Sequence, residues 1–355
     1  MSRIEECVAG IATADARAKQ EAQRLQDNLT KPQGSLGKLE ALSVRLAGIY
    51  RAPKPSMGRK VVFTMAADHG VTSEGVSAYP AEVTRQMVLN FANGGAAINV
   101  LARHVGAEVR VVDMGVACDD EWPSCVLRRK VANGTKSMAR GPAMTVGEAR
   151  KSLETGIDLA ETAVREGFTA LGVGDMGIGN TTAASAVTSV ITGKSVREVT
   201  GRGTGIDDAR LNAKIAVIDR AIDLNQPDPS DGIDVLAKVG GLEIGGMAGV
   251  ILGGAHHGVP VFVDGFVSCS AALVAANLCP RSVDYMVASH LSVEPGHAYA
   301  LAHLGLVPVL DLGMRLGEGT GAALAMSVAD ASCKVLSEMA TFEGAGVSQS
   351  SDNVS

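Results

Sequence analysis

The sequence predicts an α/β fold: a doubly wound, mostly parallel, Rossmann-like sheet with a small helical domain formed from both ends of the chain. Short apolar runs of β type alternate with helical patterns through most of the 355 residues. Glycine turns separate them, and this order is typical of a parallel sheet that helices cover on both faces. The 46% hydrophobic content with only 3% aromatic residues and 42 glycines indicates close layers of Ala, Val and Leu.

The expected strands are apolar runs bounded by turn residues; they cover 60–67, 107–116, 168–174, 259–265, 284–290 and 306–313. The expected helices lie between them, near 81–104, 147–166, 180–192, 207–223, 243–256, 266–278, 295–304 and 319–338. In such a sheet the ligand crevice lies outside the carboxyl ends of the strands. We therefore expect the polar loops that follow the strands to converge at one edge.

The chain divides into four expected parts. Residues 1–55 have helical patterns and no strand pattern, so we expect them to contribute to the small helical domain. Residues 56–315 form the expected α/β nucleotide-binding domain, and 316–342 carry a C-terminal helix that joins the small domain. Residues 343–355 are polar and are expected to be a disordered tail.

Charge and cysteine usage exclude several classes of protein. The formal net charge of −6 argues against a large nucleic-acid surface. No apolar stretch reaches the roughly 20 residues that cross a bilayer, and the charged N-terminus is unlike a signal peptide. The six cysteines form no CxxC pair, and several lie in apolar runs. We therefore expect free thiols and a cytoplasmic protein without a nucleic-acid or membrane partner.

The loop "GVGDMGIGNTT" has Gly172, Gly174 and Gly177 in GxGxxG spacing after a strand. This spacing alone is a weak sign of a dinucleotide site. Asp175 would repel a pyrophosphate there, and no strand ends in an acid about 20 residues later. Tight turns and close helix packing are the other interpretation of the glycines. The next residues are candidate N-caps: Asn180, Thr181 and Thr182.

A second loop, "GRGTGIDDARLNAK", combines Arg202 and Thr204 with three glycines before a helix that Asp207 or Thr204 would cap. Lys214 falls in the second turn of that helix. Such a loop suits a monophosphate, although a surface turn with solvated charges explains it equally well. Three strand-end residues suit ribose hydroxyls or phosphate oxygens: Asp264, Gly265 and Ser292.

The loop "LGMRLGEGTGAALA" places Glu318 where a strand–glycine–helix junction would otherwise attract an anion. Its structural interpretation is an acid that complements a helix dipole. His290 and His297 with Asp68 and His69 lack ligand spacing on one face, so no metal is expected. Neither HExxH nor GxSxG is present.

Taken together, several segments resemble one family. They are "NLTKPQGSLGKLE", "AADHGV", "GVSAYP", "GDMGIGNTT", "GGLEIGGMAG" and "LGMRLGEGTGAALA". In this order, from about residue 28 to about 340, they resemble the nicotinate-nucleotide–dimethylbenzimidazole phosphoribosyltransferase family. The resemblance implies a homodimeric enzyme without cofactor. It implies transfer of ribose 5-phosphate from nicotinate mononucleotide to a benzimidazole, giving α-ribazole 5'-phosphate, the cobalamin lower-ligand nucleotide, and nicotinate.

The resemblance also assigns roles residue by residue. Glu318 matches the general base, and Asp175 matches a second carboxylate near the reacting ring, where many relatives carry Glu. Three residues match positions of the benzimidazole pocket: Gln86, Met176 and Leu316. Six match positions around the nucleotide: Gly177, Gly203, Lys214, Asp264, Gly265 and Ser292.

The implied chemistry explains an acid in the glycine loop. As one benzimidazole nitrogen attacks the ribose, the N–H on the other becomes acidic, and Glu318 takes that proton. Apolar neighbours would raise the pKa of Glu318 toward neutrality. Asp175 would support the developing cation or position the acceptor. An NAD(P)-dependent oxidoreductase and a non-catalytic nucleotide- or base-binding protein are the alternatives, and the natural acceptor base stays open.

Overall fold

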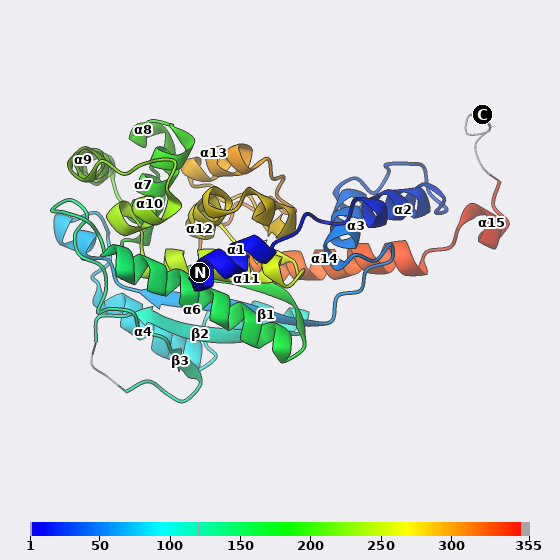
Figure 1. The fold of residues 1–355 in the computed structure, drawn as a ribbon, viewed down its shortest axis with the longest axis horizontal. Helices are drawn as coiled ribbons and strands as arrows, with labels where there is room; N and C mark the ends of the chain where they lie inside the picture. Colours follow the sequence, from blue (N-terminus) through cyan, green and yellow to red (C-terminus); the bar gives the residue numbers. More distant parts are fainter. Residues whose placement is uncertain (1, 119–120, 349–355) are drawn as a thin grey trace.

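The computed structural model describes residues 2–118 and 121–348, and its centre is one six-stranded sheet (Figure 1). All strands are parallel, in the order β3-β2-β1-β4-β5-β6. Their bounds are Arg59–Ala67 (β1), Ala107–Gly115 (β2), Val126–Arg128 (β3), Phe168–Met176 (β4), Val261–Val263 (β5) and Met286–Ala288 (β6). In a doubly wound sheet the chain adds strands first toward one edge and then toward the other, and here that change of order falls between β1 and β4. The predicted fold class is therefore confirmed.

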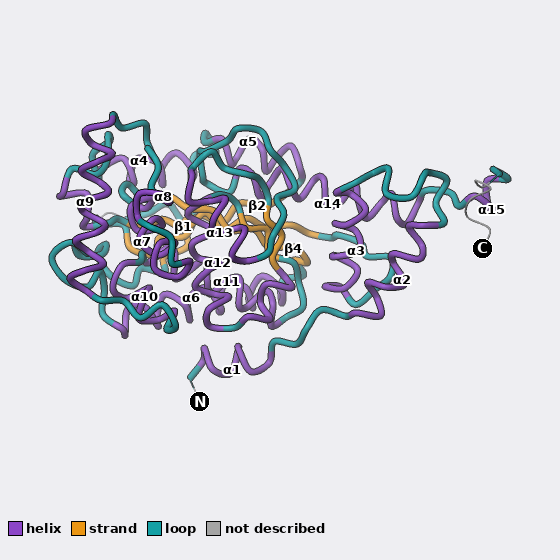
Figure 2. The backbone as a smooth tube through the Cα atoms, turned by 90° about the horizontal axis from the view of Figure 1, so that it is seen from above, coloured by secondary structure: helices purple, strands orange, loops and turns teal. Residues whose placement is uncertain are grey.

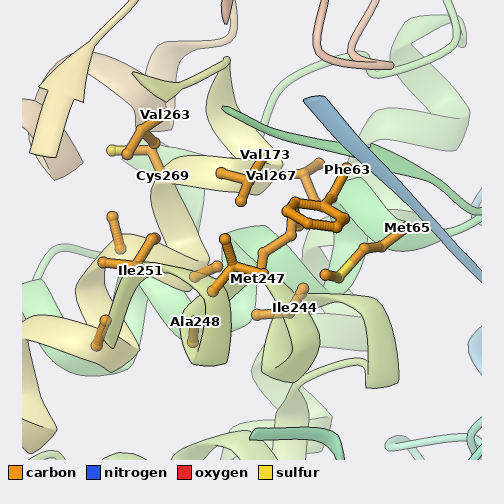
Figure 3. Packing of buried hydrophobic residues seen from close by; sticks show 14 of the residues in the cluster. Phe63, Met65, Val173, Ile244, Met247, Ala248, Ile251, Val263, Val267 and Cys269 are labelled. Atoms are coloured by element: carbon orange, nitrogen blue, oxygen red, sulfur yellow. The ribbon is translucent and has the colours of Figure 1, made fainter. Parts of the chain in front are cut away.

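Helices cover both faces of the central strands, and the buried residues of β1 and β4 are therefore mostly apolar. Figure 3 shows Phe63 and Met65 of β1 and Val173 of β4 packed against Met247 and Val267 from helices that cover the sheet. All five side chains are buried. The core therefore fixes the plane of β1 and β4, whose ends carry the polar loops.

Two helical layers enclose the sheet (Figures 1 and 2). One face carries α4 (Glu82–Ala92), α5 (Ala97–Val105) and α14 (Thr320–Glu338). The other carries α6 (Val146–Arg165), α11 (Leu242–His256) and α12 (Phe266–Leu278). Further helices pack beyond α12 on that side: α7 (Asn180–Thr192), α8 (Val196–Val199), α9 (Asp208–Asn225), α10 (Gly232–Val239) and α13 (Pro295–Leu304). Two 3-10 segments, Gly70–Glu74 and Pro280–Tyr285, complete this part of the chain.

The N-terminal helices separate into two groups. Figures 1 and 2 show α2 (Ala16–Asp27) and α3 (Lys38–Tyr50) beside the C-terminal part of α14, extending away from the sheet. A small apolar cluster joins these three helices: Ala22, Ala47 and Leu336.

The first helix, α1 (Arg3–Gly10), does not lie in the small helical domain to which residues 1–55 were assigned from sequence. It packs against α6 and α11 instead of α2 and α3. Its apolar side chains Ile4 and Cys7 are buried there, and Arg3 pairs with Asp158 on α6 at 3.2 Å. Burial of this short apolar stripe on the α/β body accounts for the difference.

Two local predictions differ from the structure, and one strand has no counterpart among the expected ones. The helix expected over 81–104 is two helices, because the chain turns at 93–96 and Gly94 has φ +74°. The strand expected over 306–313 is wrong: this segment runs beside β6 but forms a single bridge, between Leu310 and His290. Pro308 lacks the N–H that a ladder needs. The short strand β3 was not predicted.

The C-terminal end is only partly described. Phe342–Ala345 form a one-turn helix, α15, at the start of the segment expected to be a disordered tail. Residues 349–355 of that segment lie outside the described residues. Among the helices that the structure describes, none is long and apolar enough to cross a membrane.

Candidate active site

A cavity of about 510 Å³ opens at the carboxyl ends of the strands, beside the switch in strand order between β1 and β4. Its wall combines segments that are far apart in the sequence. They include Tyr79, Val83 and Met87 near α4, Asp175–Ile178 after β4, Gly203 and Thr204, Gly265–Val267 after β5, Ser292 and Glu294, and Arg315–Glu318 before α14. The expected convergence of loops at one edge is therefore present.

The loop before α14 has an unusual backbone. Glu318 has φ +65°, between Gly317 at φ +84° and Gly319 at φ +94°. A left-handed conformation is costly for a residue with a side chain and is concentrated at functional sites. The backbone of Glu318 is held at both ends: its N–H donates to Asp175 O at 3.2 Å, and its carbonyl accepts from Thr64 Oγ1 at 2.8 Å.

This close approach requires glycine on the neighbouring strand. A Cβ atom on Gly174 would lie 2.2 Å from Gly319 N and 2.3 Å from Glu318 C. Gly172 and Gly177 are also packed: a Cβ atom there would lie 3.0 Å from Met326 Cε and 2.3 Å from Ala67 O, respectively. The GxGxxG spacing thus serves close packing of the strand end, the structural interpretation of the motif.

Glu318 lines the cavity and is buried, with 5% of the residue exposed. Its Oε2 accepts from the backbone N–H of Ile98, in the first turn of α5, at 3.2 Å. Its Oε1 has no hydrogen-bond partner among the described residues. Burial raises the pKa of Glu318, the neighbouring Asp264 raises it further, and the Ile98 N–H opposes the rise.

The N-terminus of α14 is occupied by a different acid. Asp264 Oδ2 accepts from Gly319 N at 3.1 Å, and Oδ1 accepts from Gly321 N at 2.6 Å and Ala322 N at 3.0 Å. Asp264 thus satisfies the donors that an anionic ligand would use. It lies behind the wall of the cavity, although the resemblance placed it around the nucleotide.

Asp175 stands at the end of β4, next to the Glu318 loop. Its Oδ2 accepts from Asn180 Nδ2 at 2.7 Å. Asn180 therefore holds Asp175 and does not cap α7, whose N-cap is Gly179. Burial raises the pKa of Asp175 well above the usual range, and the negative charges of Asp264, Glu243 and Glu318 raise it further. Its carboxyl is consequently held toward the neutral form.

One wall of the cavity is apolar. Met176 and Leu316, which the resemblance assigns to the benzimidazole pocket, are among its lining residues, and Leu316 is 58% exposed. Helix α4 contributes Val83 and Met87 to this wall. Gln86 differs from the expectation: it is exposed on α4 and lies outside the lining of the cavity.

The remaining lining is largely polar or backbone and is called the polar wall; it carries four of the residues expected around the nucleotide, Gly177, Gly203, Gly265 and Ser292. Lys214 lies behind this wall: its Nζ donates to Thr181 Oγ1 at 2.9 Å and to Gly201 O at 3.3 Å. Burial lowers the pKa of Lys214 to about 8, and the Glu294 carboxylate opposes this shift. Asp207 caps α9 through Arg210 N at 2.8 Å, as one of the two predictions for that helix stated.

The residues considered for a metal do not form a metal site. Across residues 2–118 and 121–348, no group of three or more His, Cys, Asp or Glu side chains is placed to hold an ion. His297 Nδ1 accepts from Ser292 N at 2.9 Å, and burial lowers the pKa of His297 to about 3. His69 bonds Glu243 Oε1 at 2.7 Å in the interior.

Several lining residues were missed by the sequence reasoning: Tyr79, Val83, Met87, Phe266, Glu294 and Arg315. Two of them lie inside quoted motifs, and a third lies close to an expected site residue. Tyr79 belongs to "GVSAYP", Glu294 follows Ser292 by two positions, and Arg315 precedes Leu316. The motifs indicate which loops carry these residues, but no sequence pattern indicates which of their side chains line the cavity.

The strand order and the acid-bearing cavity at the sheet's edge define an α/β enzyme scaffold, and comparison with known proteins defines its class. A family model described as a phosphoribosyltransferase (DBI_PRT) matches residues 11–347. The chain belongs to this family.

Two similar relatives carry the same name. A protein of Chloroflexus aggregans is 59% identical over 98% of this chain and 99% of its own length; it is called nicotinate-nucleotide--dimethylbenzimidazole phosphoribosyltransferase. A protein of Geobacter sulfurreducens with the same name is 55% identical over 98% of this chain and 99% of its own length. The crystal structure of CobT from Thermus thermophilus matches with a TM-score of 0.91 and 47% identity, covering 94% of this chain and 100% of that one.

Proposed function

We propose that this protein transfers ribose 5-phosphate from nicotinate mononucleotide to 5,6-dimethylbenzimidazole or a related base, giving α-ribazole 5'-phosphate and nicotinate. One observation carries the proposal: a single cavity joins an apolar wall with an open carboxylate, Glu318, to a polar wall of backbone and hydroxyl donors. The first suits a flat heteroaromatic base, and the second suits a sugar phosphate. The family and the names of its members favour this reaction over a nicotinamide-dependent oxidoreductase.

Glu318 acts as the general base in this proposal, and the benzimidazole is the nucleophile. The bond from ribose C1 to the nicotinate nitrogen breaks with its electron pair, so nicotinate leaves as a neutral pyridine ring. A benzimidazole nitrogen forms the new bond to C1, and the proton on the other nitrogen passes to Glu318 Oε1. Ile98 N–H holds the other oxygen at 3.2 Å and so orients the carboxylate. General-base help of this kind contributes about 10²–10⁴-fold.

Asp175 acts as a positioning residue in this proposal. Its raised pKa favours the neutral acid, which carries no charge to stabilise a cation. A neutral carboxyl can donate a hydrogen bond, and Asn180 orients it at 2.7 Å. Positioning of the acceptor is therefore the role that its burial supports, of the two considered from sequence.

Three features of organisation are also proposals. We assign α2, α3 and the end of α14 to a small helical unit, supported by their shared apolar cluster. We infer a homodimer, supported by apolar side chains that the single chain leaves exposed, Val293, Val307 and Leu312. A cytoplasmic location is supported by cysteines that are all free.

The proposal is tested by incubating the protein with nicotinate mononucleotide and a panel of bases, without added metal or redox cofactor. Mass spectrometry should find free nicotinate and the base joined to ribose phosphate in equal amounts. Omission of the base is the control. A protein that frees no nicotinate with any benzimidazole does not have this activity.

A further inference from the structure

The Glu294 side chain has an unusual set of partners. Glu294 is the N-cap residue of α13, where a polar side chain normally accepts from its own helix. It makes no such bond; its Oε1 instead accepts from the backbone N–H of Gly203 at 3.0 Å. The residue is 7% exposed, and Oε2 is buried without a hydrogen-bond partner among the described residues.

Gly203 belongs to the polar wall that would receive the sugar phosphate. Its φ of +51° turns the loop so that a Cβ atom there would lie 3.4 Å from Lys214 Nζ and 2.8 Å from Thr181 Oγ1. A backbone N–H, an ammonium group and a hydroxyl therefore meet at one place. This combination of donors is suited to a phosphate oxygen. The Glu294 carboxylate already occupies part of it.

Glu294 is only half satisfied there. A buried carboxylate with one hydrogen bond and one unpartnered oxygen is destabilised relative to a fully bonded one. The side chain also has space to leave, because Glu294 lines an adjoining cavity of about 370 Å³ as well as the main one. Gly203, Glu294 and Arg315 form the partition between the two cavities.

We propose that Glu294 is a built-in competitor for the phosphate subsite: its carboxylate accepts the Gly203 N–H and yields it when a phosphate group binds. This inference rests on the proposed function, since that function supplies the phosphate-bearing ligand. The competition limits the affinity for substrate and product alike. It acts on the phosphate and not on the nicotinate or the base.

The test compares wild type with Glu294→Gln, which removes the charge and keeps the shape. Calorimetry measures the binding of inorganic phosphate, nicotinate mononucleotide and nicotinate riboside, which lacks the phosphate. The Kd for the first two should fall about tenfold in the variant, equivalent to about 1.4 kcal/mol. The Kd for the riboside should not change. Asp311→Asn, an exposed acid, removes the same charge and should leave all three unchanged.

Two further variants separate a charge effect from a folding defect. Glu294→Ser also removes the carboxylate but places a good N-cap residue on α13, and it should tighten phosphate binding likewise. Lys214→Met should weaken phosphate binding at least tenfold. Unchanged or weaker phosphate binding in both folded Glu294 variants overturns the inference, as does equal tightening for the riboside or in Asp311→Asn.

Failure of the inference is distinguishable from failure of the proposed function. If wild type frees nicotinate but neither Glu294 variant binds phosphate more tightly, the competitor role is wrong and the transferase stands. If phosphate binding tightens but no nicotinate is freed with any base, the transferase assignment is wrong and the subsite remains.

Discussion

Two carboxylates stand at the start of α14, and they differ in how fully they are used. Asp264 accepts three backbone N–H groups through both of its oxygens and lies behind the cavity wall. Glu318, which directly precedes the N-cap residue Gly319, accepts one N–H through Oε2, lines the cavity, and has no hydrogen-bond partner for Oε1 among the described residues. A carboxylate whose acceptor sites are filled by the protein supports structure, whereas one with an open oxygen is available to a ligand.

The same comparison explains why an acid is tolerated in an anion-attracting loop. Asp264 neutralises the helix N-terminus from inside, so the donors of Gly319, Gly321 and Ala322 are not free for a phosphate. Glu318 is then left to face a base, and the phosphate goes to the loop of Gly203. Because Asp264 occupies the N-terminus of α14, the general base and the phosphate site can lie on different loops.

The largest effect is expected from Glu318→Gln. The amide keeps the shape and the bond from Ile98 N–H but takes no proton, so kcat should fall about 10²–10⁴-fold. The Kd for nicotinate mononucleotide should stay within about twofold, since no phosphate or ribose contact is removed. Steady-state kinetics and calorimetry measure the two. Wild-type turnover in this variant would show that Glu318 is not the base.

The next effect concerns stability. Asp264→Asn replaces an oxygen that accepts backbone N–H groups with an NH₂ group that donates, so buried donors lose their partner. We expect the free energy of unfolding to fall by about 2–4 kcal/mol, measured by urea denaturation. Glu318→Gln should change it by less than about 1 kcal/mol, because one bond is retained. Equal stability losses would remove the distinction between the two acids.

A smaller effect tests the apolar wall beside Glu318. Leu316 is 58% exposed, so Leu316→Ala should cost little stability. It should raise KM for the benzimidazole about fivefold, through loss of roughly 1 kcal/mol of apolar contact. Leu224→Ala is the matched control, since Leu224 is equally apolar and 54% exposed but lies outside the cavity lining. The same KM change in both variants would argue against a ring seated on Leu316.

Much of the fold follows from local sequence. The long strands β1, β2 and β4 were predicted within two residues of their ends, because buried parallel strands are continuous apolar runs. The segment 306–313 has the same composition but contains Pro308, and three-residue β3 lies in a polar context. Propensity alone does not decide whether an apolar run at the edge of a sheet joins the ladder.

The sequence predicts which loops form the site better than it predicts which side chains line the cavity. Glu318, Asp175, Met176 and Leu316 line the cavity, whereas Gln86 does not. Motif spacing shows which loop reaches the sheet's edge, but the direction of a side chain depends on distant partners. Asp264 illustrates this, because its hydrogen-bond donors follow it by 55 to 58 positions.

The pH dependence of kcat, measured for wild type and Glu318→Gln with saturating nicotinate mononucleotide and 5,6-dimethylbenzimidazole, tests the central claim most directly. The carboxylate is the active form, and burial raises the pKa of Glu318. The wild-type rate should therefore rise with pH through a midpoint above that of an ordinary glutamate and then level off, and the variant should lack this step. The same rising step in both proteins would contradict proton transfer to Glu318.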